Sequence, residues 1–232
     1  MRRWAPAEIV EAAIANRCAS IAFTYSEPIL SLELAEEVYA LARPAGVDLV
    51  FVTNGQGTPA AIDALGGILA AANVDLKCFD EGKYARVLGG ELQATLHAIR
   101  EWKARGVWVE VTTLVVPGFS DGEEELSRIA AFLASIDPEI PWHVSRFHPA
   151  SEWTDRPATP LAAIERALEI GRAAGLLYVY AGNAPGSAGE RTLCPACGAV
   201  LIDRDGYRIR RVAVAEGRCG ACGARIAGAG LP

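Results

Sequence analysis

The chain has 232 residues, of which 51% are hydrophobic and 22% charged, so it is long enough for one well-packed domain and a small appendage. Its formal net charge of −6 argues against non-specific nucleic-acid binding. It has no signal-peptide core and no apolar run near the roughly 18 residues that span a membrane, and its cysteine pairs have metal-ligand spacing, so we expect a cytoplasmic protein without a membrane partner.

Helix-period segments alternate with short β-rich runs from a first helix at about 6–16 onward, the pattern of a parallel α/β fold. Ser120-x-x-Glu123 predicts a capping box at the start of one helix. The predicted strands are 19–24, 48–53, 72–77, 107–115, 142–147 and 177–181, and the later helices are 31–43, 58–70, 80–87, 91–105, 121–135 and 160–174.

Six strands with intervening helices, and with polar residues at the carboxyl ends of the strands, favour a partial (βα) barrel. A βα repeat normally begins with its strand, but here a helix comes first. We therefore expect that the chain begins half a repeat late and lacks the first strand of the barrel.

The first strand is followed by Ser26, Glu27 and Pro28. A glutamate before a proline holds a carboxylate and backbone carbonyls in a fixed position, which is suited to binding an amine. The alternative is an ordinary strand-to-helix loop in which Glu27 is solvated.

The second strand ends in Thr53, Asn54 and Gly55. An Asn-Gly pair forms a tight turn that exposes backbone donors, although turn chemistry alone also explains it. In the third strand, alternation places Asp75 and Lys77 on one face. The pair could bind a zwitterionic amino acid, Lys77 could form a Schiff base, or the two could make an internal salt bridge.

Three polar residues come from the strand at 142–147 and its end. His143 faces the side opposite Arg146 and His148, which makes the latter two the better site candidates. His97 lies in the middle of a predicted helix and is expected to pack or face solvent. Together, polar groups on four consecutive strands predict a small-molecule site at one rim.

Two C-x-x-C pairs near the end of the chain are the most specific motif. Their residues are Cys194, Cys197, Cys219 and Cys222. Four thiolates close a tetrahedral zinc site with no open position, so we expect a structural site; rubredoxin-like iron and a redox dithiol are the alternatives. A hairpin turning at Asp205-Gly206 between the pairs predicts a zinc ribbon, and we expect domains at 1–185 and 186–232.

Several segments together resemble one family, the radical S-adenosylmethionine (SAM) protein of the AmmeMemoRadiSam system, a relative of pyruvate formate-lyase activating enzymes. These segments are TYSEP, FVTNG, NVDLK, VWVEVTTLVVPG, PWHVSRFHP, YVYAGN and the CPACG and CGACG pairs. The resemblance implies a partial barrel that holds SAM and a [4Fe–4S] cluster. It implies an unknown substrate, and other proteins of that system as possible partners.

The resemblance also implies roles for single residues. Ser26, Glu27 and Pro28 match a motif that holds the SAM amino group, although Tyr25-Ser26 stands where the family has two glycines. Thr53, Asn54 and Gly55 match a second SAM-lining loop, with Val52 in place of an aspartate. Asp75 and Lys77 match residues that bind the methionine amine and carboxylate, His148 lies near the carboxylate, and Val115 and Val116 line the adenosine pocket.

The family's cluster needs a C-x3-C-x2-C loop, and the sequence contains none. The loop is expected upstream of the Trp4-Ala5-Pro6 segment, so the resemblance also predicts a missing N-terminus. We therefore expect a radical SAM enzyme chain that is inactive by itself. The alternatives are a SAM-binding or structural protein without a cluster, a barrel enzyme with Lys77 as a Schiff-base lysine, and a nucleic-acid-binding ribbon, which the acidic body disfavours.

Overall fold

The computed structural model describes residues 4–206 and 208–231, and the chain divides into two compact units. The first unit comprises Met1–Asp75 and Tyr84–Glu110, and the second comprises Leu76–Lys83 and Val111–Pro232. This division falls inside the predicted 1–185 domain, whereas the cysteine pairs belong to the second unit. The 1–185 and 186–232 boundary stays a prediction.

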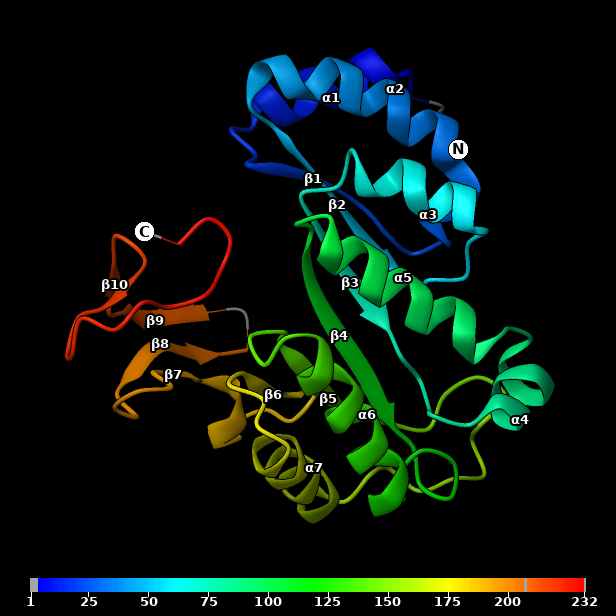
Figure 1. Cartoon of the computed structure of the whole chain (residues 1–232), viewed down its shortest axis with the longest axis vertical. Helices are drawn as coiled ribbons and strands as arrows, with labels where there is room; N and C mark the ends of the chain where they lie inside the picture. Colours follow the sequence, from blue (N-terminus) through cyan, green and yellow to red (C-terminus); the bar gives the residue numbers. More distant parts are fainter. Residues whose placement is uncertain (1–3, 207, 232) are drawn as a thin grey trace. The chain divides into compact units, whose positions relative to one another are not determined.

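Strands β1 to β6 follow one another in the sheet in the same order as in the chain, as expected for successive βα repeats (Figure 1). Within the units, β1 pairs with β2, β2 with β3, β4 with β5 and β5 with β6, and all four pairs are parallel. The predicted α/β class with a six-stranded parallel sheet is therefore confirmed.

The first unit contains three whole strands, their helices and the first residues of β4. Its elements are α1 (Pro6–Ala15), β1 (Ser20–Phe23), η1 (Pro28–Ser31), α2 (Leu32–Ala42), η2 (Arg43–Ala45), β2 (Asp48–Thr53), α3 (Pro59–Gly66), β3 (Ala71–Asp75), the π-helical turn η3 (Tyr84–Leu88) and α5 (Leu92–Ala104). Trp102 of α5 is fully buried, and its indole N–H donates to the Ile62 carbonyl of α3 at 2.9 Å. This bond satisfies a polar group inside the apolar layer.

The second unit contains the rest of the α/β fold and the cysteine-rich segment. Its elements are α4 (Glu81–Lys83), the main part of β4 (Trp108–Val115), α6 (Glu123–Ile136), β5 (Trp142–Arg146), α7 (Leu161–Ala173), β6 (Val179–Gly182), η4 (Ala188–Glu190), β7 (Thr192–Leu193), β8 (Val200–Asp205), β9 (Arg208–Val212), β10 (Val214–Ala215) and β11 (Arg218–Cys219).

The two faces of β5 and β6 have different environments. Trp142 and Val144 are fully buried, whereas His143 between them is half-buried. A Cβ atom added to Gly171 of α7 would lie only 2.9 Å from both Trp142 and Val179. Helix α7 therefore packs directly on the Trp142 face, and His143 lies on the opposite face.

One local prediction is wrong. Ser120 does not cap α6, which begins at Glu123 after Gly122; its hydroxyl instead donates to the Leu114 carbonyl and accepts from the Val116 N–H. The third strand ends at Asp75, two residues earlier than predicted, but the alternation of buried and half-buried residues continues through Cys78.

The predicted hairpin between the cysteine pairs is present. Strands β8 and β9 pair antiparallel, with Asp205 opposite Arg208. The segment is attached to the α/β part of its unit, because the Ala227 N–H donates to the Tyr178 hydroxyl at 3.2 Å and Arg225 pairs with Glu139 at 3.4 Å. Burial raises the pKa of Tyr178, which keeps its hydroxyl neutral.

Among the described residues, no helix is both long and apolar enough to cross a membrane.

The close contact at Gly171 gives a test of the packing. We expect Gly171→Ala to lower the free energy of unfolding by about 1–3 kcal/mol, because its methyl group would overlap Trp142 and Val179. Gly67→Ala is the matched control, since its methyl group would make only an ordinary contact 3.5 Å from the Ala64 carbonyl. Both variants are measured by urea denaturation. An equal loss in the free energy of unfolding for Gly171→Ala and Gly67→Ala would contradict this packing.

Candidate functional site

In the first unit, the Glu27 carboxylate joins the ends of β1 and β2. Its Oε1 accepts from the Thr53 hydroxyl at 2.5 Å and from the Ile29 N–H at 3.3 Å, and its Oε2 accepts from the Asn54 N–H at 2.8 Å. The Thr53 hydroxyl also accepts from the Gly55 N–H at 3.0 Å. The structure thus brings together four of the predicted residues, and Glu27 is bonded rather than simply solvated.

The loop before Glu27 has the backbone conformation that glycine adopts most easily. Tyr25 has a φ of 73°, and its side chain is fully exposed. A side chain therefore stands at a left-handed position, at a cost that glycine would avoid. Ser26 and Pro28, which follow, line a cavity of about 230 Å³ with Ile21 and Phe23.

Two residues that the sequence analysis missed support the turn after β2. The Thr95 hydroxyl of α5 is fully buried and donates to the Asn54 carbonyl at 2.9 Å. The Gln56 amide donates to the Thr95 hydroxyl at 2.7 Å and to the Glu91 carbonyl at 2.8 Å. These contacts join residues about 40 positions apart, so no local pattern could have revealed them.

Asp75 and Lys77 belong to different units. Asp75 is the last residue of β3 in the first unit and is half-buried. Lys77 belongs to the second unit and is also half-buried. Both side chains make interactions with other residues.

In the second unit, Thr159 joins two of the predicted residues. It is fully buried, and its hydroxyl donates to the Val115 carbonyl at 2.5 Å and accepts from the Phe147 N–H at 3.0 Å. Its carbonyl accepts from Arg146 Nε at 2.6 Å. Thr159 therefore connects the ends of β4 and β5 and orients the Arg146 guanidinium.

The three histidines have different positions. His148 follows β5 and is exposed, as expected for a rim residue. His143 stacks on Tyr180, with ring centroids 5.2 Å apart, because the two residues are opposite each other on β5 and β6. His97 lies on α5, half-buried, and lines an open groove of about 850 Å³ with Gln56 and Gln93.

The four C-terminal cysteines form a candidate metal centre. Their sulfur atoms all lie within 4.8 Å of one another; Cys194 and Cys222 are 3.7 Å apart, and Cys197 and Cys219 are 3.8 Å apart. Zinc–sulfur bonds of about 2.3 Å in a tetrahedron give sulfur separations of about 3.8 Å, so the four thiols fit a tetrahedral ion. Iron in a rubredoxin-like site needs the same arrangement.

The two halves of this centre have the same backbone. In each half, the N–H of a glycine (Gly198 or Gly223) donates to the carbonyl of the first cysteine at 2.8 Å. Both glycines have a φ near +73°, a left-handed conformation that glycine adopts most easily. The backbone N–H groups of Cys222 and Ala221 lower the pKa of Cys219 to about 7, which favours the thiolate that a metal requires.

Cys222 differs from Cys219 in the direction of its pKa shift. The Ala224 N–H lowers its pKa, but the neighbouring Cys197 thiol and burial outweigh this and raise it to about 12. A thiolate at one cysteine therefore disfavours deprotonation of the next, and a bound cation would neutralise both charges.

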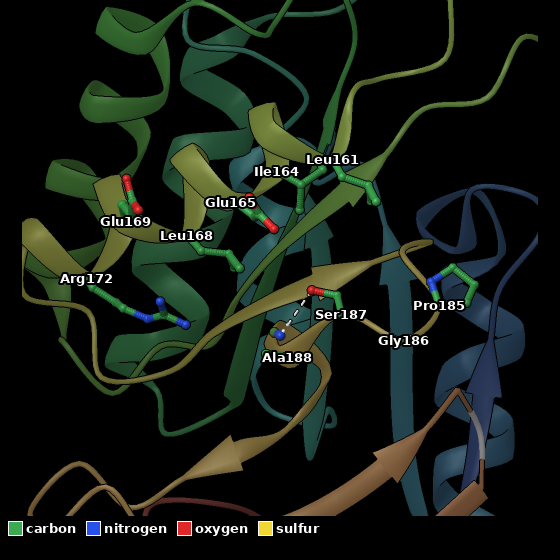
Figure 2. A pocket seen from close by; sticks show the side chains of 11 residues that line it. Leu161, Ile164, Glu165, Leu168, Glu169, Arg172, Pro185, Gly186, Ser187 and Ala188 are labelled. Atoms are coloured by element: carbon green, nitrogen blue, oxygen red, sulfur yellow. Dashed lines mark hydrogen bonds between the residues drawn. The ribbon is translucent and has the colours of Figure 1, made fainter.

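A separate groove of about 410 Å³ lies between α7 and residues 185–189 (Figure 2). The groove is lined by the apolar residues Leu161, Ile164 and Leu168. The charged residues Glu165, Glu169 and Arg172 of the same helix also line it. None of the predicted site residues lines this groove.

The model of the radical SAM superfamily matches residues 4–133, more than half of the chain. The chain belongs to the radical SAM superfamily. An uncharacterized protein of Methanocaldococcus jannaschii is 39% identical over 228 residues, a match that covers 97% of this chain and 68% of that relative. The wider superfamily is therefore established, and the AmmeMemoRadiSam assignment within it stays a prediction.

Solved structures show the same radical SAM fold. A domain of a pyruvate-formate lyase-activating enzyme from Bacteroides vulgatus has a TM-score of 0.61 at 18% identity and covers 70% of this chain and 98% of that domain. Streptococcus suis SuiB bound to S-adenosylmethionine has a TM-score of 0.62 at 14% identity, covering 78% of this chain and 44% of SuiB.

The cysteines of this radical SAM chain do not fit the three-cysteine cluster of the superfamily. Cys18 stands alone and exposed after α1. Cys78 is fully buried, and burial raises its pKa to about 11, so it is a poor metal ligand. The remaining four cysteines form their own closed group.

The bonds of Thr53 allow the first-unit site to be tested. We expect Thr53→Val to lower the free energy of unfolding by about 1–3 kcal/mol, because the buried Gly55 N–H and Glu27 each lose a partner. Thr24→Val, at an exposed position, should change it by less than about 0.5 kcal/mol. Equal effects of the two substitutions in urea denaturation would show that the Glu27 bonds add no stability.

The metal centre predicts a simple stoichiometry. We expect elemental analysis to find a single tightly bound metal ion per chain, lost in Cys194→Ser with a fall in Tm. Cys18→Ser should keep the ion, because this exposed thiol lies outside the cluster. Retention of the ion by Cys194→Ser would contradict four-cysteine coordination.

Proposed function

We propose that this chain provides the SAM-binding part of a radical SAM enzyme. The reaction would be reductive cleavage of SAM to a 5′-deoxyadenosyl radical, followed by hydrogen abstraction from a substrate. The observation that carries this proposal is the superfamily match over residues 4–133, which includes the polar ends of β1, β2 and β3. A [4Fe–4S] cluster supplies the electron in this chemistry.

In the first unit, we assign the amine of SAM to the loop of Ser26, Glu27 and Pro28. The bonds from Thr53, Ile29 and Asn54 hold the Glu27 carboxylate in place. Oε2 accepts only one of these bonds and keeps further acceptor capacity for an ammonium group. Fixing the carboxylate before the ligand arrives lowers the entropic cost of binding. Gly55 completes the loop and Asp75 is a second acceptor for the amine.

In the second unit, Lys77, Arg146 and His148 are the proposed partners of the SAM carboxylate, and Val115 borders the adenosine. The bond to Thr159 fixes one edge of the Arg146 guanidinium and leaves its other donors for an anion. The sequence contains no C-x3-C-x2-C loop, so we expect no reductive cleavage of SAM by this chain alone.

The missing C-x3-C-x2-C motif favours a second candidate function. A protein that retains the SAM-binding residues without cluster ligands could bind SAM without radical chemistry. Saturable SAM binding by a chain that never forms 5′-deoxyadenosine, even when a cluster loop is supplied by a second polypeptide, would support this alternative.

We also propose that the four-cysteine centre holds zinc in a structural role, since a closed set of four thiolates leaves no position for a substrate. We also propose a cytoplasmic location, because the cysteine pairs have metal-ligand spacing, and interaction with other proteins of the AmmeMemoRadiSam system, which the resemblance implies.

SAM binding provides the direct test. We expect saturable binding in isothermal titration calorimetry, weakened about tenfold to a hundredfold by Asp75→Asn, because a charge-assisted hydrogen bond is worth about 1.5–3 kcal/mol. Glu37→Gln removes an exposed carboxylate on α2 and should leave the Kd unchanged. Absence of SAM binding by the folded chain would contradict the proposal.

The second measurement concerns the chemistry. After anaerobic reconstitution with iron and sulfide, we expect no 5′-deoxyadenosine from SAM and dithionite, because the three cluster ligands are absent from the sequence. Catalytic formation of 5′-deoxyadenosine by this chain would show that other residues hold the cluster.

A further inference from the structure

The half-buried face of β5 and β6 carries a polar cluster that the proposed SAM site does not use. His143 and Tyr180 stack on this face, which is opposite the face that packs on α7. The Tyr180 hydroxyl lies 3.1 Å from the Thr192 hydroxyl of β7. The cluster therefore joins the α/β sheet to the cysteine-rich segment.

Arg204 of β8 completes this cluster. Its guanidinium carbon lies 5.9 Å from the centre of the Tyr180 ring, and its Nη2 donates to the Thr192 hydroxyl at 3.4 Å. Both contacts are long, so they position the guanidinium without satisfying it.

In the part of the chain that the structure describes, Arg204 forms no salt bridge with a carboxylate. Its Nε is buried and has no hydrogen-bond partner in the described part of the chain. Other arginines of the same segment do have carboxylate partners, since Arg191 pairs with Asp203 at 3.0 Å and Arg225 pairs with Glu139. A buried N–H donor without a partner is costly, and such groups normally have one.

We propose that Arg204 binds an oxyanion, a carboxylate or phosphate group of the substrate, on the β5–β6 face beside Tyr180. The planar guanidinium matches both groups. One hydroxyl of the Tyr180–Thr192 pair can add a further donor, because the other hydroxyl donates within the pair. Arg204 as a whole is only half-buried, so a ligand can reach its side chain. The interpretation of this site as a substrate site rests on the proposed function, whereas the prediction that Arg204 binds an anion does not.

This assignment gives the cysteine-rich segment a direct part in ligand binding. A metal held by the four cysteines fixes the start of β8 through Cys194 and Cys197, and β8 carries Arg204. Metal loss should therefore weaken anion binding even though the metal does not touch the anion.

The experiment uses the histidine ring protons as reporters, because the chain has only three histidines. Inorganic phosphate and acetate are titrated separately into the metal-loaded full chain at constant ionic strength set with chloride, and His143→Gln assigns the resonance. We expect a saturable shift of His143, with the tighter of the two anions identifying the source of the oxyanion. A His143 shift that does not saturate with either anion would overturn the proposal.

Variants of Arg204 decide the role of its guanidinium. Arg204→Met should abolish the saturable shift, and Arg204→Lys should weaken binding at least about fivefold, because a lysine cannot form the forked contact. Arg208→Met is the matched control, since Arg208 is an exposed residue of the same hairpin. An Arg204→Met variant that binds the anion like the wild type would overturn the assignment; if it does not fold, Arg204→Lys decides alone in the same way.

Titration with SAM separates this inference from the proposed function. We expect Arg204→Met to keep the wild-type Kd for SAM, because Arg204 is not among the proposed SAM-binding residues. Absence of SAM binding by the wild-type chain would remove the proposed function, while the phosphate and acetate titrations would still decide whether Arg204 binds an anion.

Discussion

The alternation of side chains along β5 and β6 is the constraint on which much of the second unit depends. In a strand buried on one side by a helix, every second residue must be apolar and closely packed. Trp142, Val144 and Val179 satisfy this requirement against α7, where Gly171 lets the helix approach. The residues between them face away from α7 and need not be apolar. His143 and Tyr180 can therefore carry polar chemistry without loss of the core.

The sequence was sufficient to predict what depends on local periodicity and spacing. The six strands appear close to the expected positions, because each has a continuous β-branched or alternating run, and the cysteine pairs come together because each C-x-x-C-G turn is determined locally. Ser120 shows where this reasoning fails. The capping motif predicted a bond to the following helix, but the Ser120 hydroxyl bonds to the Leu114 carbonyl and the Val116 N–H of the preceding segment.

The contacts that support the site could not be read from the sequence. Thr95 bonds Asn54, Thr159 bonds Val115 and Arg204 reaches Thr192, each across 12 or more positions. A threonine in a helix or a loop carries no local signal of such a partner. The strand-end residues were predictable because parallel strands always present their carboxyl ends at one edge, whereas the residues that orient them depend on how helices and loops pack.

The bond between Tyr178 and Ala227 has a practical consequence for handling the protein. Ile226 and Ala227 are buried, so the backbone beyond the last cysteine forms part of the interior of its unit. Cleavage by a protease before residue 226 would remove apolar surface and leave the phenol of Tyr178 without its donor. Affinity tags and fluorescent labels therefore belong after this point, and limited proteolysis there would yield a species prone to aggregation.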